Sequence, residues 1–285
     1  MDRNAFDALI DLFPVTSESD KYYLALAKQR AWQTLPHLPR GTGTERLLDV
    51  GSFKALMGPV FIDLWNYGEV AVVGADVEPH SVIRRQAPMT GKGYSFQAEF
   101  CNIEKEPMPF ADGSFDVVVV TEVIEHLLMD PVYAMNEINR VLVPGGRVLF
   151  SVPNAASDEC LTFLVNNEQP GFLRQYLSNG LKIGNKDLDT VYEMGHYHEY
   201  TSREAIALVE SCGFEVIKRS GISYSPEHLA GWRWKLLKTF VHCLFPRSRR
   251  VREDVIVMLL RKKGPYVPLE KLANRFPAPL YRTYA

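Results

Sequence analysis

The hydrophobic pattern of the chain predicts buried strands that alternate with helices. Strands are expected at 47–50, 70–77, 95–103, within 111–123, and at 147–154, 214–221 and 254–264. Runs such as VAVVG and FDVVVV are apolar at consecutive positions, which is typical of strands covered on both faces. The order of the elements predicts an α/β fold with a doubly wound sheet and a ligand crevice at the carboxyl ends of its strands.

Helical periodicity places helices before and between these strands. They are expected at 4–13, 20–35, 131–143 and 201–214. The last has the clearest signals, since Thr201 can cap it, Glu204 completes a capping box and Gly213 ends it. A further helix is expected in ALMGPVFIDLWNYG after the first strand, with Gly58 and Pro59 disturbing its pattern.

The elements divide the chain into a core domain and its additions. We expect an N-terminal helical segment at 1–43, a core domain at 44–264 and a tail at 265–285. Within the core domain, 155–200 is too long for a simple connection and is expected to cover the active site. The N-terminal helices either cover a pocket or pack on the sheet, and the sequence leaves both open.

Composition narrows the classes of protein to which the chain can belong. It has 285 residues, 46% hydrophobic and 23% charged, with a formal net charge of −2, so no global field favours DNA. The four cysteines are scattered, the N-terminus resembles no signal peptide, and no apolar run reaches membrane-spanning length. We therefore expect a cytoplasmic protein, and the sequence does not indicate its oligomeric state.

A basic amphipathic insertion is predicted at 225–253. Lys235, Lys238 and His242 share one helical face, and seven Lys or Arg with no acid lie between 233 and 252. Such a helix suits peripheral contact with the inner face of a membrane through 229–252, or a phosphorylated substrate. It equally suits a helix packed on the domain by its apolar face, with a solvated basic side.

The first strand and the turn after it favour a ligand that contains adenosine. Asp49 lies near the end of the strand and Gly51 begins the turn, where backbone N–H groups converge on one point. Asp76 ends the second strand, roughly 20 residues further on, where an acid can accept hydrogen bonds from ribose hydroxyls. The alternative is that Asp76 only caps the turn that follows it.

A series of motifs carries a resemblance to a known family. Read in order, LLDVGS, GADVEP, PFADGSFDVVVVTEVIEHL, EINRVLVPGGRVLFSVPN and HYHEYTSREAIALVESCGFEV resemble class I S-adenosylmethionine-dependent methyltransferases. The closest likeness is to the bacterial small-molecule, glycan and lipid branch. The resemblance implies a Rossmann-like sheet of seven strands, the last of them antiparallel, and S-adenosylmethionine as the cofactor.

The resemblance also implies a set of cofactor-binding residues. These are Asp49, Gly51, Asp76, Asn102, Ile103 and Glu122. One motif departs from the family, whose first turn usually reads GxGxG, whereas this chain has Gly51-Ser52-Phe53-Lys54-Ala55. A side chain at position 53 restricts the turn. Either the loop takes another path, with Gly58 relieving the crowding, or cofactor affinity is reduced.

Acid and histidine side chains are expected near the methyl acceptor. Glu122, Glu125 and His126 follow the fourth strand, and His196 and His198 precede the helix capped by Thr201. Our catalytic candidates are His126, His196 and His198, because imidazole accepts a proton near neutral pH. A second interpretation, similar to the small-RNA ribose methyltransferases, is that these groups bind a divalent metal. A third is that they are structural, and we assign no metal ligands.

The sequence therefore predicts a methyltransferase that acts on an oxygen, or secondarily a nitrogen, of a small molecule, glycan or lipid-linked precursor. Two alternatives remain at this point. One is a metal-assisted RNA ribose 2′-O-methyltransferase, and the other is a non-catalytic scaffold whose altered glycine loop has lost the cofactor.

Overall fold

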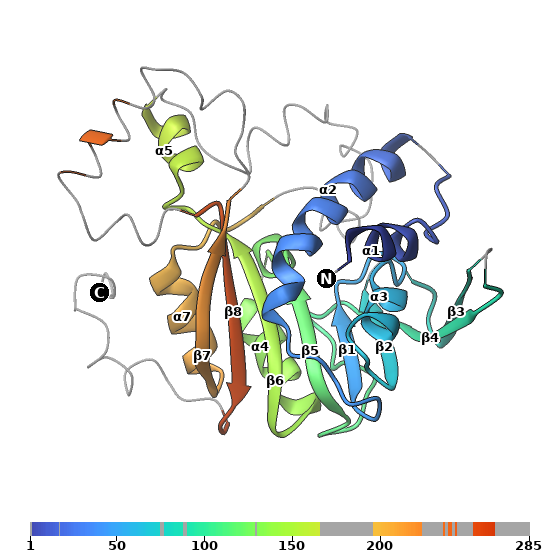
Figure 1. Cartoon of the computed structure of the whole chain (residues 1–285). Coiled ribbons are helices and arrows are strands. Elements are labelled where there is room, and N and C mark those ends of the chain that lie inside the picture. Colours follow the sequence, from blue (N-terminus) through green and yellow to red (C-terminus); the bar gives the residue numbers. More distant parts are fainter. Residues whose placement is uncertain are drawn as a thin grey trace, which may run out of the picture.

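A central sheet with helices on both faces forms the body of the protein in this computed structural model (Figure 1). The structure describes residues 2–16, 18–74, 77–87, 90–128, 130–165, 196–223, 236, 239–240, 243 and 253–265. Several predictions lie outside the described residues. They concern Asp76, most of the cover at 155–200, most of the insertion at 225–253 and nearly all of the tail.

The described elements follow the predicted order. The strands are β1 (Arg46–Val50), β2 (Glu69–Gly74), β3 (Ser81–Gln86), β4 (Gly93–Phe100), β5 (Phe115–Thr121), β6 (Leu142–Pro153), β7 (Phe214–Ile222) and β8 (Val255–Lys262). The α-helices are α1 (Arg3–Ile10), α2 (Glu18–Thr34), α3 (Gly58–Asp63), α4 (Pro131–Val141), α5 (Asp158–Val165) and α7 (Ser202–Ser211). Two short 3₁₀ helices are η1 (Leu35–His37) and η2 (Ile124–His126).

The sheet confirms the predicted fold class and adds one strand. Its order is β3-β4-β2-β1-β5-β6-β8-β7, and β8 runs antiparallel to both of its neighbours, as expected. The strand that the sequence did not indicate is β3, which pairs antiparallel with β4 at the edge. Its side chains alternate between exposed and half-buried, so it lacks the apolar run that marks the central strands.

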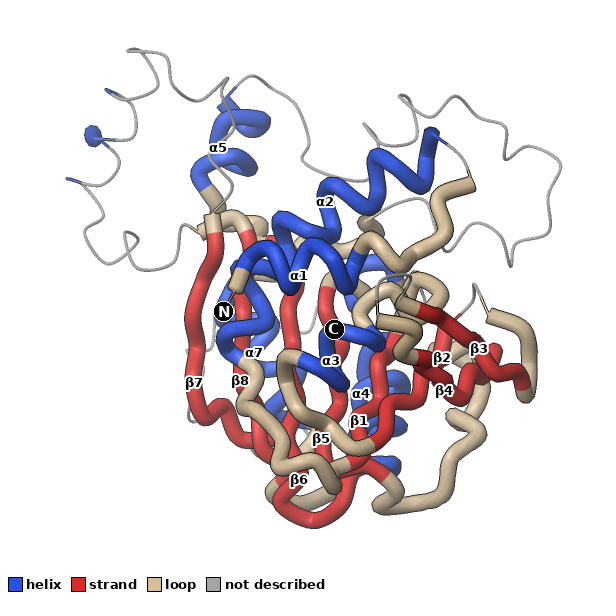
Figure 2. Tube along the Cα trace, turned by 45° about the vertical axis from the view of Figure 1, so that its right-hand side comes forward, coloured by secondary structure: helices blue, strands red, loops and turns tan. Residues whose placement is uncertain are grey.

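Alternate side chains of each central strand enter two different hydrophobic clusters. On β1, Leu48 and Val50 join the cluster that contains apolar residues of α4 and α7. Leu47 joins the cluster on the opposite face, with residues of α1 and α3. Figure 2 shows the strands between these helices. Burial on both faces explains why these strands read as continuous apolar runs.

The helix after the first turn begins later than expected. It starts at Gly58, and Pro59 lies in its first turn, where a missing N–H is tolerated. A Cβ on Gly58 would lie 2.5 Å from the Phe96 ring, so the glycine permits α3 to pack closely on β4. Gly58 and Pro59 therefore begin the helix and do not disturb it, and residues 52–57 form a loop beside the crevice.

The N-terminal segment reaches the edge of the sheet where the parallel strands end. Helix α2 lies across the carboxyl ends of the central strands (Figures 1 and 2). It contacts α1 through the rings of Trp32 and Phe6, whose centroids are 5.3 Å apart. Of the two roles left open for this segment, covering the ligand crevice agrees with this position.

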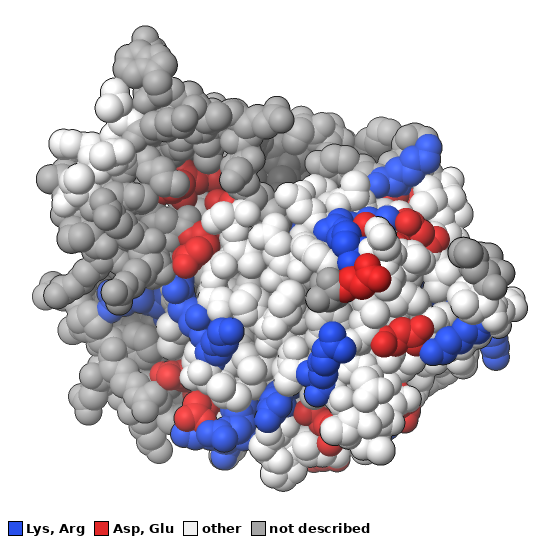
Figure 3. Space-filling model, viewed as in Figure 1, with Lys and Arg blue, Asp and Glu red and all other residues white. Residues whose placement is uncertain are grey.

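The described helices and one face of the surface bear on the expectations for membrane contact and charge. No described helix combines the length and the apolar character needed to cross a membrane. On the face shown in Figure 3, the described basic and acidic side chains are interspersed. All four cysteines, each at a described position, are free thiols.

The capping box predicted for 201–214 is present and can be tested. The Thr201 hydroxyl accepts a hydrogen bond from the Glu204 backbone N–H, and the Glu204 carboxylate accepts one from the Thr201 N–H. We expect Thr201→Ala to lower the free energy of unfolding by about 1 kcal/mol. Urea denaturation would measure this, with Thr201→Ser as the control that keeps the hydroxyl. Equal losses in both variants would contradict a capping role.

Candidate active site

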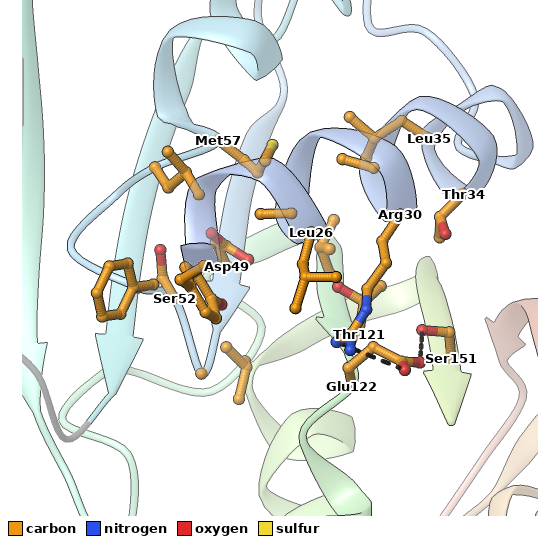
Figure 4. Close-up of a pocket in the computed structure, with 18 of the residues that line it drawn as sticks. Leu26, Arg30, Thr34, Leu35, Asp49, Ser52, Met57, Thr121, Glu122 and Ser151 are labelled. Carbon is orange, nitrogen blue, oxygen red and sulfur yellow. Dashed lines mark hydrogen bonds and ion pairs between the residues drawn. The ribbon is translucent and has the colours of Figure 1, made fainter. Parts of the chain in front are cut away.

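A crevice opens at the carboxyl ends of β1, β5 and β6, beneath α2 (Figure 4). The strands and the turns that follow them contribute polar side chains, namely Asp49, Ser52, Thr121, Glu122 and Ser151. The helix contributes Tyr23, Leu26, Ala27, Arg30, Ala31 and Thr34. Parallel strands end at the same edge of a sheet, so residues far apart in sequence meet here.

Asp49 stands at one end of the crevice as a buried carboxyl group. Its exposed fraction is 7%, and burial raises its pKa to about 7. The Ser52 hydroxyl beside the crevice is also buried, and its hydrogen bond to the Asp49 carboxyl opposes the rise of the Asp49 pKa. A carboxylate and a hydroxyl in this state suit a ligand that brings an ammonium group, as S-adenosylmethionine does.

Gly51 makes the turn after β1 possible. Its φ is +72°, and a Cβ at this position would lie 2.4 Å from Cγ2 of Val123. Two later positions of the loop also have left-handed backbone although they are not glycine, since φ is 48° at Lys54 and 57° at Ala55. Such conformations cost roughly 1–2 kcal/mol for residues that carry a Cβ. The altered motif therefore forms a sharply turned loop without its second and third glycines.

Phe53 occupies the position of the second glycine of the family motif, and its ring makes contacts that a glycine could not make. Its ring lies 4.3 Å from that of Tyr23 on α2 and 5.2 Å from that of Phe13, measured between centroids. This aromatic cluster joins the loop to the N-terminal segment. From the motif alone, a side chain at position 53 is expected only to restrict the turn. The partners of the ring lie far upstream in the chain, so nothing within the motif indicates these contacts.

Glu122 closes the floor of the crevice from the end of β5. Its φ of 55° is unusual for a residue with a long side chain. The Ser151 hydroxyl donates a hydrogen bond to its Oε1 at 2.8 Å, and Nη1 of Arg30 lies 3.9 Å from its Oε2 (Figure 4). Burial raises the pKa of Glu122, and the positive charge of Arg30 opposes this rise.

The structure brings His126 and His196 together beside Glu122. Their rings meet edge to face at 4.8 Å, and His126 lines the crevice. His196 is positioned because the backbone N–H of Tyr197 donates to the Glu125 carbonyl oxygen at 2.8 Å. Its Nδ1 lies 2.7 Å from Oε1 of Glu199. Two of the three predicted catalytic histidines thus share one location.

Glu125 lies beneath this histidine pair. Its exposed fraction is 0%, and its Oε1 is 3.8 Å from Nε2 of His126. Burial raises its pKa well above the usual value, and the neighbouring charge of Glu122 raises it further. Burial of a carboxyl group costs it its hydration, and a carboxyl group that is nevertheless buried in such a place indicates a functional site.

Three predicted residues lie elsewhere. The ring of His198 packs on Tyr200 at 4.4 Å and borders a second hollow, together with Leu127 and Pro131. Asn102 and Ile103 follow β4 and are not among the residues that line the crevice. The Asn102 side chain accepts the Glu104 backbone N–H, which makes a local turn. Ile103 is buried in the core.

Comparisons with known proteins identify relatives of this chain. Residues 48–150 match the family described as Methyltransferase domain. A Mycolicibacterium smegmatis protein named "Probable S-adenosylmethionine-dependent methyltransferase" is 31% identical over 224 residues, which cover 76% of this chain and 71% of that one. A Cereibacter sphaeroides "Ubiquinone biosynthesis O-methyltransferase" is 26% identical over 193 residues, 67% of each chain.

Solved structures share the fold. A chain of the complex between the Haloferax volcanii Trm112 methyltransferase activator and a methyltransferase aligns with a TM-score of 0.53 at 15% identity, covering 91% of this chain and 98% of that one. An S-adenosylmethionine-dependent methyltransferase of Mesorhizobium loti gives 0.50 at 12% identity, covering 81% and 97%.

Fold and crevice define a class I methyltransferase. The chain belongs to the S-adenosylmethionine-dependent methyltransferases, and S-adenosylmethionine is its cofactor. It is therefore an enzyme, and the scaffold alternative raised by the altered glycine loop is set aside.

Asp49 offers a test in which cofactor binding and stability change in opposite directions. Its pKa of about 7 in the folded protein is above the unfolded value of 3.8, so ionisation at higher pH destabilises the fold. We expect Asp49→Asn to raise the free energy of unfolding at pH 8 by about 1–3 kcal/mol and to leave it unchanged below pH 4. The same variant should lose binding of S-adenosylhomocysteine.

Urea denaturation at both pH values and calorimetric titration would measure these effects. Asp112→Asn is the control, since this exposed residue makes only a surface ion pair with Arg140. A destabilised Asp49→Asn protein at pH 8 would show that the carboxylate has a stabilising partner instead.

Phe53 tests whether the altered loop obstructs the ligand or holds the cover in place. We expect Phe53→Ala to weaken S-adenosylhomocysteine binding several-fold and to make residues 1–43 more sensitive to protease, because two aromatic contacts are lost. Phe53→Leu keeps apolar bulk, so its affinity for S-adenosylhomocysteine and its protease sensitivity should lie between those of the parent and of Phe53→Ala. Tighter binding in Phe53→Ala would identify the ring as an obstacle.

Proposed function

We propose that this enzyme transfers the methyl group to an oxygen of a small molecule, a glycan or a lipid-linked precursor. The observation that carries the proposal is the pair of imidazoles, His126 and His196, beside the crevice that begins at Asp49. A hydroxyl acceptor must lose its proton as it becomes a nucleophile, and imidazole accepts protons near neutral pH. This requirement favours oxygen over nitrogen as the acceptor atom.

The cofactor end of the crevice is assigned to Asp49, Gly51 and Glu122. When bound, S-adenosylmethionine supplies a methyl group on a positively charged sulfur, and the electron pair of the broken C–S bond stays on that sulfur. Asp49 would hold the ammonium group, and Gly51 would allow the backbone to approach. The family resemblance implies Asp76 as the ribose ligand and Asn102 with Ile103 at the adenine, which would then lie beyond the part of the crevice lined by the described residues.

The acceptor end is assigned to His126, with His196 beside it. His126 lines the crevice and its side chain is 30% exposed, so it can take the hydroxyl proton and pass it to solvent. Glu199 holds the ring of His196 in place. We leave His198 out of the proton-transfer step, because its ring lies against Tyr200.

Two observations support a small acceptor over RNA. Relatives named for an O-methylation step of ubiquinone biosynthesis align with two thirds of the chain. The net charge is −2, and basic and acidic groups are mixed on the described face in Figure 3, whereas RNA partners are typically met by a basic surface.

A transfer assay tests this function. The full chain and labelled S-adenosylmethionine would be offered hydroxylated aromatic compounds, sugars and polyprenyl phosphates, each with a matched amine. We expect label on oxygen and a loss of at least about 100-fold in turnover for His126→Asn, with the affinity for S-adenosylhomocysteine within about threefold. Label on the amines alone, or full turnover by His126→Asn, would overturn the assignment.

A further inference from the structure

A second hollow lies between the start of α4 and helix α7. Its described lining consists of Leu127, Leu128, Pro131, Tyr197, His198, Tyr200 and Leu208. The hollow has a volume of about 470 Å³, whereas the crevice beneath α2 has about 190 Å³. Binding sites for small organic molecules have volumes of roughly 300–1,000 Å³, so the hollow is large enough to hold part of a ligand.

The hollow begins directly next to the histidine pair. Leu127 follows His126 in the chain, and Tyr197 follows His196. The Tyr197 backbone N–H donates a hydrogen bond to the Glu125 carbonyl oxygen at 2.8 Å, so this segment is held on the 3₁₀ helix η2. Neighbouring Cα atoms are about 3.8 Å apart, and one molecule can therefore contact the pair and the hollow at once.

The described lining of the hollow is apolar and aromatic, without Lys, Arg, Asp or Glu. Leu128 is 52% exposed there. A single exposed leucine is ordinary, but apolar side chains gathered around a concave surface favour an apolar ligand. Asp130, which precedes Pro131, accepts the Tyr133 N–H as the N-cap of α4 and is not among the residues that line the hollow.

Tyr200 gives the hollow a wall that is fixed by the sheet. This residue is 5% exposed and forms a parallel bridge with Asn154, directly after β6. Its carbonyl oxygen accepts the Ala155 N–H at 2.9 Å. The ring of His198 packs on the Tyr200 ring, so the histidine that was left out of proton transfer contributes to the border of the hollow.

We propose that the hollow holds an uncharged hydrocarbon substituent of the methyl acceptor, whose hydroxyl lies at His126. The cofactor must occupy the crevice beneath α2, so the rest of the acceptor needs a place next to it. A sugar would bring hydroxyls against apolar side chains, and a phosphate would meet no Lys or Arg among the described lining residues. An alkyl or prenyl chain gains by leaving water there.

This inference rests on the proposed function and narrows its acceptor. Of the acceptor classes named there, a hydroxylated compound that carries a hydrocarbon chain fits the hollow, and a glycan does not. The hydroxyl would be recognised at His126 and the chain in the hollow. The two halves of acceptor recognition can therefore be measured separately.

The probes are phenol, 4-propylphenol and 4-hexylphenol, which share one hydroxyl and differ only in chain length. Calorimetry and ligand-detected NMR on the full chain, saturated with S-adenosylhomocysteine, would measure their binding. We expect the affinity to rise about two- to fourfold for each methylene that is buried. Leu128→Asp should lower the affinity for 4-hexylphenol at least about tenfold and change that for phenol less than about twofold, since a charge replaces apolar surface at an exposed position.

Val82→Asp is the matched control variant. Val82 is 46% exposed and lies on β3, at the far edge of the sheet from α7. Its replacement should leave the affinities for all three phenols unchanged. The affinity of each variant for S-adenosylhomocysteine shows that the cofactor half of the fold is intact.

The outcomes separate this inference from the proposed function. Equal affinity for phenol and 4-hexylphenol, no saturable binding of any phenol at millimolar concentration, or a chain-length effect that survives in Leu128→Asp would overturn the hollow as a subsite. So would a dimer that Leu128→Asp dissociates in sedimentation experiments, because a second copy would then cover the hollow. Chain-length-dependent binding without methyl transfer would support the hollow and contradict the oxygen acceptor. Methylation of all three phenols at equal efficiency would support the function and contradict the hollow.

Discussion

The constraint on which this site depends is the burial of carboxylates at the carboxyl edge of a parallel sheet. Asp49 is the next-to-last residue of β1, and Glu122 and Glu125 follow β5, so the pairing of β1 with β5 brings them to one edge of the sheet. Helix α2 lies over Asp49 and Glu122 and narrows their access to solvent. Each acid is less stable ionised here than in solvent, and the site is thereby prepared for positively charged ligands.

The two ends of the crevice meet this constraint differently. At Asp49 the compensating charge would come from the cofactor, which arrives and leaves with each turnover. Around Glu125 the groups are more deeply enclosed, and Arg30 approaches the neighbouring Glu122 only at 3.9 Å. A carboxyl group in such a place either takes up a proton and becomes neutral or stays ionised beside a cation.

The features of the fold and the site that could be predicted from the sequence are those set by interactions between residues close together in the chain. The succession of strands and helices along the chain, the turn at Gly51 and the capping box at Thr201 follow from local signals, namely apolar runs, a glycine and a cap. Glu122 was expected at the crevice because it follows a buried strand. The edge strand β3 and the later start of α3 at Gly58 were missed, since alternating exposure and packing on Phe96 leave weak local patterns.

The loop at Phe53 shows why the rest of the site was harder to predict. By its motif alone, the loss of two glycines indicates a damaged cofactor site. In the structure the same ring contacts Phe13 and Tyr23, some 30–40 positions earlier in the chain, and so attaches the cover to the loop. No local pattern reports a contact between segments so far apart. A departure from a family motif should therefore be interpreted together with the segment that packs against it. Here the large side chain that replaces a glycine holds the N-terminal segment on the loop.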